Sequence, residues 1–383
     1  MASKMPLSWL QLIKEKGRLI VALAGITFAD ILMFVQLGLL DALYDSATQG
    51  HRDLDTDLVV VNRQVKTLID LQSFPRTRLY QASAHPDVST VSPLYIGFAP
   101  WRNPETQIQR NILVWGIDPA KPPFAYADLQ ENSNYLKLLD RVLFDQASRP
   151  EYGSITEPVS QTGRLEAQVA NQTIQVVGLF ELGASFGADG NIITSDTTFA
   201  NLFGDRSLDQ IDIGLIKVRP EASLEATRQQ LQDSLPDDIK VLTKGEFVDA
   251  EIQYWAEQGT GFIFQLGVGV GFVVGIVIVY QILYANVSEH LPQYATLKAM
   301  GYGDRYLLMM LFQQSLILAV LGFIPGLLLS VGLYKITYAA TLLAVVMKFE
   351  RALLVLGLTI IMCSVSGTIA MRKLQTADPA DVF

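Results

Sequence analysis

Four long apolar stretches dominate the pattern of hydrophobic and polar positions along this chain of 383 residues. They cover residues 19–43, 262–287, 307–334 and 352–371. Each is long enough to cross a bilayer as a helix, which takes roughly 20 apolar residues. Because the first stretch is too long for a signal peptide and no small-residue cleavage site follows it, we expect a retained anchor. The chain is therefore predicted to be a membrane protein with four transmembrane α-helices.

The residues between the first two spans, 44–261, have the pattern of a folded module outside the membrane. Short runs rich in β-branched residues predict strands at residues 57–63, 112–117, 174–180, 191–194 and 213–218. Leu224, Thr227, Leu231 and Leu235 recur at helical spacing before Pro236, which predicts a helix over residues 223–235. The proline-containing segments 92–104 and 119–123 are expected to be loops. We therefore predict a large α+β extracytoplasmic (periplasmic) domain between the first and second spans.

Composition and charge narrow the classes of function. The chain is 50% hydrophobic and 17% charged, with a mean hydropathy of +0.28 and a net charge of −9. Residues 44–261 hold 18 Lys and Arg against 30 Asp and Glu, a net charge of −12, so the remainder carries +3. An acidic surface argues against nucleic acid as a partner. The single cysteine, Cys363, excludes an intrachain disulfide, and the three histidines lack zinc-site spacing, so no metal site is predicted.

Basic residues near the spans set the predicted orientation. They gather in the two terminal segments: Lys4, Lys14, Lys16, Arg18, Arg372 and Lys373. By the positive-inside rule, both termini should lie in the cytoplasm of a multi-pass inner-membrane protein. Residues 1–18 are predicted to form an amphipathic elbow helix, and residues 372–383 a cytoplasmic tail. The short loop 335–351 then lies on the periplasmic side, against the rule, because it carries Lys335, Lys348 and Arg351.

The motifs of the soluble module do not form a catalytic constellation, and no catalytic residue is predicted. Asp53, Asp55 and Asp57 alternate along the chain. They would suit either a cation or, as we favour, the solvated entry to a strand. Residues 183–190, GASFGADG, have the glycines of a phosphate-binding loop but lack its Lys-Ser/Thr ending and the helix that should follow. Because the sequence has no GxxxxGK[ST] motif, we expect any nucleotide-driven motor to reside elsewhere.

Small residues recur on single faces of two spans. Gly267, Gly271 and Gly275 in the second span, and Gly322 and Gly326 in the third, are spaced four residues apart. Such faces let another helix approach closely. They serve either dimerisation or packing within the chain, and the sequence favours neither.

Asp30 lies near the middle of the first span, where an acid costs several kcal/mol unless it finds a partner or water. It is either a proton or substrate contact or, as we favour, a residue without a direct function: a packing acid held by polar neighbours such as Gln313 or Gln314, or an acid near enough to the interface to stay hydrated. Because we find no second ionisable residue within a span to form a relay, an intramembrane enzyme is not expected.

The segment between the second and third spans, residues 288–306, has the pattern of a short cytoplasmic helix. Pro292 is suited to its first turn and Gly301 to its end. The helix would present Leu297, Met300 and Tyr302 to a partner.

These features together resemble the FtsX/MacB class of ABC transporter permeases, which have one span, a large extracytoplasmic domain and three further spans. The segment after the second span, YATLKAMGY at residues 294–302, carries the resemblance most directly. The chain looks closer still to the cyanobacterial DevC branch in PLSWLQL (6–12), ALAGITFADILMF (22–34), HLPQYATLK (290–298) and DPADVF (378–383). The resemblance covers the spans and their junctions, and the module only in position and size.

The resemblance implies a homodimer that works with a separate ABC ATP-binding subunit, which binds ATP and Mg²⁺, so that this chain needs no cofactor. The coupling helix would occupy a groove of that subunit through Tyr294, Leu297, Lys298, Ala299, Met300, Gly301 and Tyr302. ATP-driven closure would move the periplasmic domain through stalk segments at residues 46–55 and 246–258. In DevC-like relatives this motion is associated with export of a lipid or glycolipid through a membrane-fusion adaptor and a TolC-like channel.

A second hypothesis is an FtsX-type signalling permease, which regulates cell-envelope hydrolases without transporting a solute. The length of the soluble module favours the exporter, because the signalling type usually carries a smaller domain. A neighbouring adaptor gene would support export, and a neighbouring coiled-coil hydrolase gene would support signalling.

Overall fold

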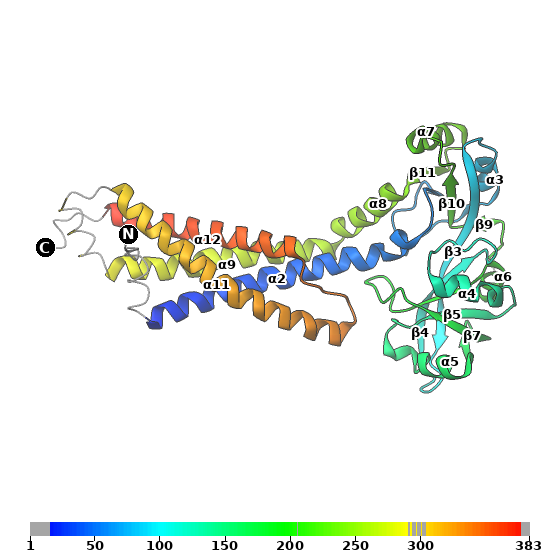
Figure 1. Ribbon diagram of the computed structural model, residues 1–383, viewed down its shortest axis with the longest axis horizontal. Helices are drawn as coiled ribbons and strands as arrows, with labels where there is room; N and C mark the ends of the chain where they lie inside the picture. Colours follow the sequence, from blue (N-terminus) through cyan, green and yellow to red (C-terminus); the bar gives the residue numbers. More distant parts are fainter. Residues whose placement is uncertain are drawn as a thin grey trace. The chain divides into compact units, whose positions relative to one another are not determined.

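The computed structural model describes residues 16–204, 206–289, 292, 296, 300 and 304–376. They form two compact units (Figure 1). The helical unit consists of the chain up to Ala42 together with the chain from Gly259 onward, and the sheet unit is Leu43–Gln258.

The helical unit contains four long helices, α2 (Lys16–Asp53), α9 (Gly259–Glu289), α11 (Asp304–Thr341) and α12 (Phe349–Thr376). All four are long and apolar enough to cross a membrane. The predicted class, four apolar helices with a large α/β domain after the first, is confirmed. The helices continue past the apolar stretches, because polar turns at their ends extend them. Residues 342–348, rather than 335–351, therefore connect α11 to α12.

Helix α9 packs against α2 in antiparallel register. Three glycines of α9 lie against successive turns of α2: Gly267 faces Gln36, Gly271 faces Leu32 and Gly275 faces Ala29. A Cβ added to Gly275 would lie only 2.9 Å from the Ala29 Cβ, closer than side chains normally approach. Glycine is therefore what lets these two helices meet at this depth.

Helix α11 packs against α2 in parallel register. Gly322 lies against Ile26 and Gly326 lies against Asp30, so both helices advance by four residues between contacts. All five glycines of the two predicted faces thus contact α2 of their own chain. Packing within the chain accounts for these faces without a second copy.

A nine-stranded sheet forms the centre of the sheet unit, in the order β11-β1-β10-β3-β4-β8-β5-β7-β6. Its strands are β1 (Leu58–Asn62), β3 (Val88–Arg102), β4 (Gln109–Ile117), β5 (Arg141–Asp145), β6 (Leu165–Val169), β7 (Gln172–Phe180), β8 (Asn191–Ser195), β10 (Ile213–Val218) and β11 (Ile239–Thr243). Strand β3 also pairs with β6, so that the strands from β3 to β6 close into a ring. The pairs β4–β8 and β5–β7 are parallel and the others antiparallel. The short strands β2 (Phe74–Pro75) and β9 (Gln210–Ile211) form a separate ribbon.

Six α-helices are described in the sheet unit, most of them beside the strands in Figure 1. They are α3 (Thr77–Ser83), α4 (Ala127–Leu136), α5 (Thr156–Thr162), α6 (Asp196–Leu202), α7 (Leu224–Ser234) and α8 (Lys244–Glu257), and a 3₁₀ turn, η1, covers Pro150–Tyr152. Helix α8 begins with a capping box: the Glu246 N–H donates to the Thr243 hydroxyl (3.1 Å), and the Thr243 N–H donates to the Glu246 carboxylate (2.7 Å). Helix α7 ends two residues before Pro236, as its sequence predicts.

Strand β1, which lies between β11 and β10, shows why this part of the sequence has a continuous apolar run. Leu58 and Val60 belong to one hydrophobic core, and Val59 and Val61 belong to another. Both faces of the strand are therefore covered, and alternation with polar residues is not required. The five predicted strands are confirmed: residues 213–218 match β10 without change, and the other four differ slightly at their ends.

The predicted loop over residues 92–104 is wrong, because residues up to Arg102 form the second half of the 15-residue strand β3. Its prolines occupy positions where the backbone nitrogen does not point toward the paired strand, so the missing N–H removes no hydrogen bond to β10 at Pro93 or to β4 at Pro100. The Pro100 carbonyl accepts from Ala170 N–H (2.9 Å), so the backbone of Pro100 points away from β4. The Leu94 carbonyl accepts from Asp212 N–H (3.2 Å), so the preceding Pro93 points away from β10.

Candidate functional site

The predicted coupling segment lies largely outside the described residues. Tyr294, Leu297, Lys298, Ala299, Gly301 and Tyr302 are among those not described. The Met300 N–H donates to the Thr296 carbonyl (3.0 Å), and the Thr296 hydroxyl donates to the Pro292 carbonyl (2.9 Å). Met300 is 63% exposed. The described residues thus carry hydrogen bonds at helical spacing and one exposed apolar side chain, and the role of the segment stays a prediction.

Asp30 is fully buried in the helical unit, with one oxygen hydrogen-bonded. The Thr359 hydroxyl of α12 donates to Asp30 Oδ1 (2.6 Å). Gln313 and Gln314, the predicted partners, are not at its level on α11, because the residue facing Asp30 there is Gly326. Twelve to thirteen residues of helix separate them from Gly326, about 18–20 Å along the axis. If Asp30 is a packing residue, as we favour, its polar neighbour is Thr359 instead of Gln313 or Gln314.

A charge pair between the buried Arg351 and the partly exposed Asp41 joins α2 to α12 at the other end of the helical unit. The Arg351 side chain, 5% exposed, donates from Nε to the Asp41 carboxylate (3.0 Å) and from Nη1 to the Tyr334 hydroxyl (3.1 Å) and the Val346 carbonyl (3.0 Å). Its charge is therefore neutralised within the protein. Arg351 does not act as a free loop charge, which removes the strongest part of the disagreement with the positive-inside rule.

The sequence interpretation missed this pair, although a signal was present. Asp41 ends the first predicted span and Arg351 precedes the fourth. The predicted topology places those two ends on the same side of the membrane. Opposite charges at matching depths are the pattern of an interhelical ion pair.

A second buried charge cluster ties three parts of the sheet unit together. Glu251 of α8 is 2% exposed, and its Oε2 lies 3.3 Å from His51 Nε2 near the end of α2. The Thr67 hydroxyl (2.8 Å), the Leu68 N–H (2.9 Å) and the Trp255 indole N–H (2.8 Å) also donate to this carboxylate. One carboxylate therefore fastens α8, the end of α2 and the loop after β1 to each other.

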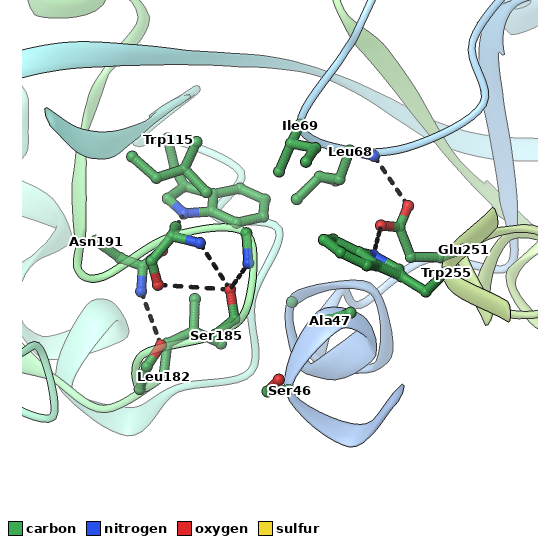
Figure 2. A pocket seen from close by; sticks show the side chains of 15 residues that line it. Ser46, Ala47, Leu68, Ile69, Trp115, Leu182, Ser185, Asn191, Glu251 and Trp255 are labelled. Carbon is green, nitrogen blue, oxygen red and sulfur yellow. Dashed lines mark hydrogen bonds between the residues drawn. The ribbon is translucent and has the colours of Figure 1, made fainter. Parts of the chain in front are cut away.

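Beside this cluster lies a small cavity, shown in Figure 2. Ser46 and Ala47 of α2, Trp115 of β4 and Trp255 of α8 line it together with the glycine-containing loop after β7. Its volume is about 30 Å³, which is room for about one water molecule. The cavity is therefore too small for an exported lipid or for a nucleotide.

The N–H groups at the start of the glycine-containing loop, residues 183–190, donate hydrogen bonds within the protein. Leu182 N–H (3.0 Å) and Gly183 N–H (2.9 Å) donate to the Asp145 carboxylate, which also accepts from the Asn191 amide (2.8 Å). Burial raises the pKa of Asp145, and these donors oppose that effect. Gly183 has φ = +98°, a conformation that favours glycine. A phosphate would have to displace an internal carboxylate from this loop.

The alternating carboxylates at the entry to β1 point to separate neighbours. Each has its own partner: Asp53 accepts from the Tyr126 hydroxyl (2.6 Å), Asp55 pairs with Lys217, and Asp57 accepts from Val218 N–H (2.8 Å). Within the described part of the chain, no group of three His, Cys, Asp or Glu side chains is arranged to hold a metal ion.

Comparison with known proteins relates the last third of the chain to a permease family. Residues 266–379 match the model of the family described as FtsX-like permease C-terminal, a stretch that includes most of α9 and all of α11 and α12. Similar solved structures include the periplasmic region of MacB from Actinobacillus actinomycetemcomitans, at 10% identity over 52% of this chain and 94% of that one, with a TM-score of 0.36. Another is the extracellular domain of the noncanonic ABC-type transporter YknZ from Gram-positive bacteria, at 12% identity over 49% and 98%, with a TM-score of 0.32.

The Glu251 cluster gives the sheet unit a defined response to acid. Burial alone raises the pKa of Glu251, but the contacts from His51, Thr67 and Leu68 outweigh it, so the pKa lies below the ordinary value of 4.5. The folded state therefore favours the carboxylate, and this stabilisation is present above pH 4.5 and is lost as pH falls through the lower, folded-state value.

We expect Glu251→Gln to lower the free energy of unfolding at neutral pH by about 1–3 kcal/mol, the value of hydrogen bonds to a charged group. Unfolding of the detergent-solubilised full chain, followed by tryptophan fluorescence at neutral and acidic pH, measures both effects. Wild type should lose stability on acidification, and the variant should lose less. Glu257→Gln, an exposed site on the same helix, should behave as wild type. Identical acid responses of wild type and Glu251→Gln would refute this account of Glu251.

Proposed function

We propose that this chain is the membrane-spanning subunit of an ATP-driven ABC export system. The observation that carries the proposal is the match of residues 266–379 to the FtsX-like permease family, on a chain with one apolar helix before and three after a large sheet unit in the sequence. The chain is not itself an enzyme in this proposal. ATP and Mg²⁺ are bound by a separate subunit, which contacts the segment between α9 and α11.

The close packing of the helical unit supports movement of a substrate outside this bundle rather than through its centre. Three polar groups inside the spans have partners within the bundle: Asp30 with Thr359, the Thr27 hydroxyl with the Gly322 carbonyl, and the Ser366 hydroxyl with the Ile276 carbonyl. An aqueous path for a polar solute needs polar groups free to face water. In the proposal, ATP-driven closure of the partner subunits moves the sheet unit instead.

Helix α2 supports the transmission of that movement, because one continuous helix contributes residues to both units. The proposal includes a homodimer, a periplasmic membrane-fusion adaptor and an outer-membrane TolC-like channel. The cargo is a lipid, a glycolipid or another amphiphile. The chain resides in the inner membrane with both termini in the cytoplasm.

The proposed coupling helix predicts a specific loss of ATPase binding. Leu297→Asp places a charge in the proposed groove contact and should weaken the complex with the cognate ATP-binding subunit by about 30-fold, as loss of a 2 kcal/mol hot spot does. Affinity purification of the co-expressed subunits measures the amount of complex. Leu139→Asp, the same substitution at an exposed position of the sheet unit, should leave the complex intact. Equal recovery of ATPase with both variants would remove the segment from the interface.

The proposed orientation predicts which residues a membrane-impermeant maleimide can reach. With Cys363→Ala as background, Lys121→Cys in the sheet unit should react in intact spheroplasts. Lys298→Cys should react only after the membrane is permeabilised. Labelling of position 298 but not position 121 in intact spheroplasts would reverse the topology and with it the proposed mechanism.

A further inference from the structure

A groove with a volume of about 410 Å³ lies between the beginning of α11 and the end of α12. Its wall includes Met309, Phe312 and Ser315 from α11 and Ser364, Gly367 and Thr368 from α12. This volume falls within the range of small-molecule binding sites, about 300–1,000 Å³. The groove therefore has room for a ligand, unlike the small cavity of the sheet unit.

The shape of the groove follows from one close helix contact. A Cβ added to Gly367 would lie 2.5 Å from the Ser315 hydroxyl oxygen, so α11 and α12 touch at this point. Larger side chains stand on either side of the contact, where Met309 is 58% and Phe312 is 46% exposed. The small residues form the floor of the groove, and the larger ones form a wall.

The hydroxyl groups of the groove are already hydrogen-bonded within their own helices. Ser315 donates to the Leu311 carbonyl (2.9 Å), Ser364 to the Ile360 carbonyl (2.7 Å) and Thr368 to the Ser364 carbonyl (2.8 Å). These three hydroxyl hydrogens are therefore already donated, and an occupant of the groove cannot accept them. The wall favours an apolar occupant over a polar one.

The position of the groove along the helices indicates which apolar molecule is present there. Met309 begins the candidate span of α11, and Thr368 lies two residues before the end of the span of α12 at Ala370. The groove therefore belongs to one leaflet, where the surrounding molecules are lipid acyl chains. The next turn of α12 carries Arg372 and Lys373, and basic residues beside a span attract anionic headgroups.

We propose that this groove binds one acyl chain of an anionic phospholipid from the surrounding leaflet, with the headgroup at the basic end of α12. The bound lipid is a component of the bilayer and is distinct from any exported cargo. The site depends on the helical unit alone, so it stands whether or not the proposed export function is correct.

Photocrosslinking tests the site directly. The full chain is reconstituted in phosphatidylcholine nanodiscs with phosphatidylglycerol that carries a diazirine in one acyl chain, and crosslinked peptides are identified by mass spectrometry. We expect crosslinks to concentrate on the peptides that contain Met309, Phe312 and Thr368. A phosphatidylcholine probe with the same acyl chain should give roughly 30-fold fewer, as expected for two basic residues near a headgroup.

Two matched variants distinguish a site from general contact with lipid. Thr368→Trp fills the groove and should abolish most of the focused crosslinking, and Ser364→Phe should do the same from the neighbouring turn. Ile369→Trp adds the same ring at an exposed position outside the groove and should have no effect.

Three results would overturn the proposal. Labelling spread evenly over all exposed helix faces would show bulk lipid only, and equal labelling by the two probes would remove the anionic preference. Absence of lipid crosslinks from the groove peptides would show that the groove does not admit an acyl chain, as it would if residues 1–15 or a second copy of the chain filled it.

Discussion

The close approach of α9 and α11 to helix α2 is the constraint on which the helical unit depends. In a bilayer the hydrophobic effect does not drive helices together, so their association depends on packing and on hydrogen bonds. Glycines on both partners provide that packing. Gly275 and Gly326 bring α9 and α11 onto α2, and from α2 itself Gly38 receives the Tyr334 ring.

The same packing gives one oxygen of the buried Asp30 carboxylate a partner within the protein, and leaves Oδ2 without one among the described residues. Once Gly326 has brought α11 against Asp30, Thr359 of α12 completes the hydrogen bond. One end of the bundle repeats this arrangement with a full charge pair, in which Arg351 contacts both Asp41 and the Tyr334 hydroxyl. An unpaired buried charge there would cost several kcal/mol. These contacts define the depth and rotation of α12 relative to α2 as well as their proximity.

Local pattern predicted the elements of the fold well, and it failed where tertiary contacts override local rules. Apolar length is sufficient to find the four helices, and β-branched runs find strands such as β1 and β7. Strand β3 was missed because its prolines, Pro93 and Pro100, normally end strands. Here their ring nitrogens face positions where no ladder bond is formed.

The candidate site was harder to predict because its partners are distant in sequence. His51 and Glu251 are separated by 200 residues and have no shared motif. The partner of Asp30 was sought among glutamines, the more polar residues of α11, whereas the structure uses Thr359 of α12, whose hydroxyl lies within hydrogen-bond distance of the carboxylate. The glycine spacing left open whether these faces meet a second copy or the same chain, and the structure places α2 of the same chain against them.

Disulfide trapping in native membranes tests the central role of α2 most directly. A Cβ on Gly271 lies 3.3 Å from the Leu32 Cβ, close to the separation found in disulfides, whereas a Cβ on Gly269 meets no atom within 4 Å. With Cys363→Ala as background, mild oxidation of the Leu32→Cys, Gly271→Cys pair should consume both thiols within one chain, and the Leu32→Cys, Gly269→Cys pair should stay reduced. Crosslinking of the first pair only between two chains, or equal crosslinking of the two pairs, would contradict α2 as the helix on which this bundle is built.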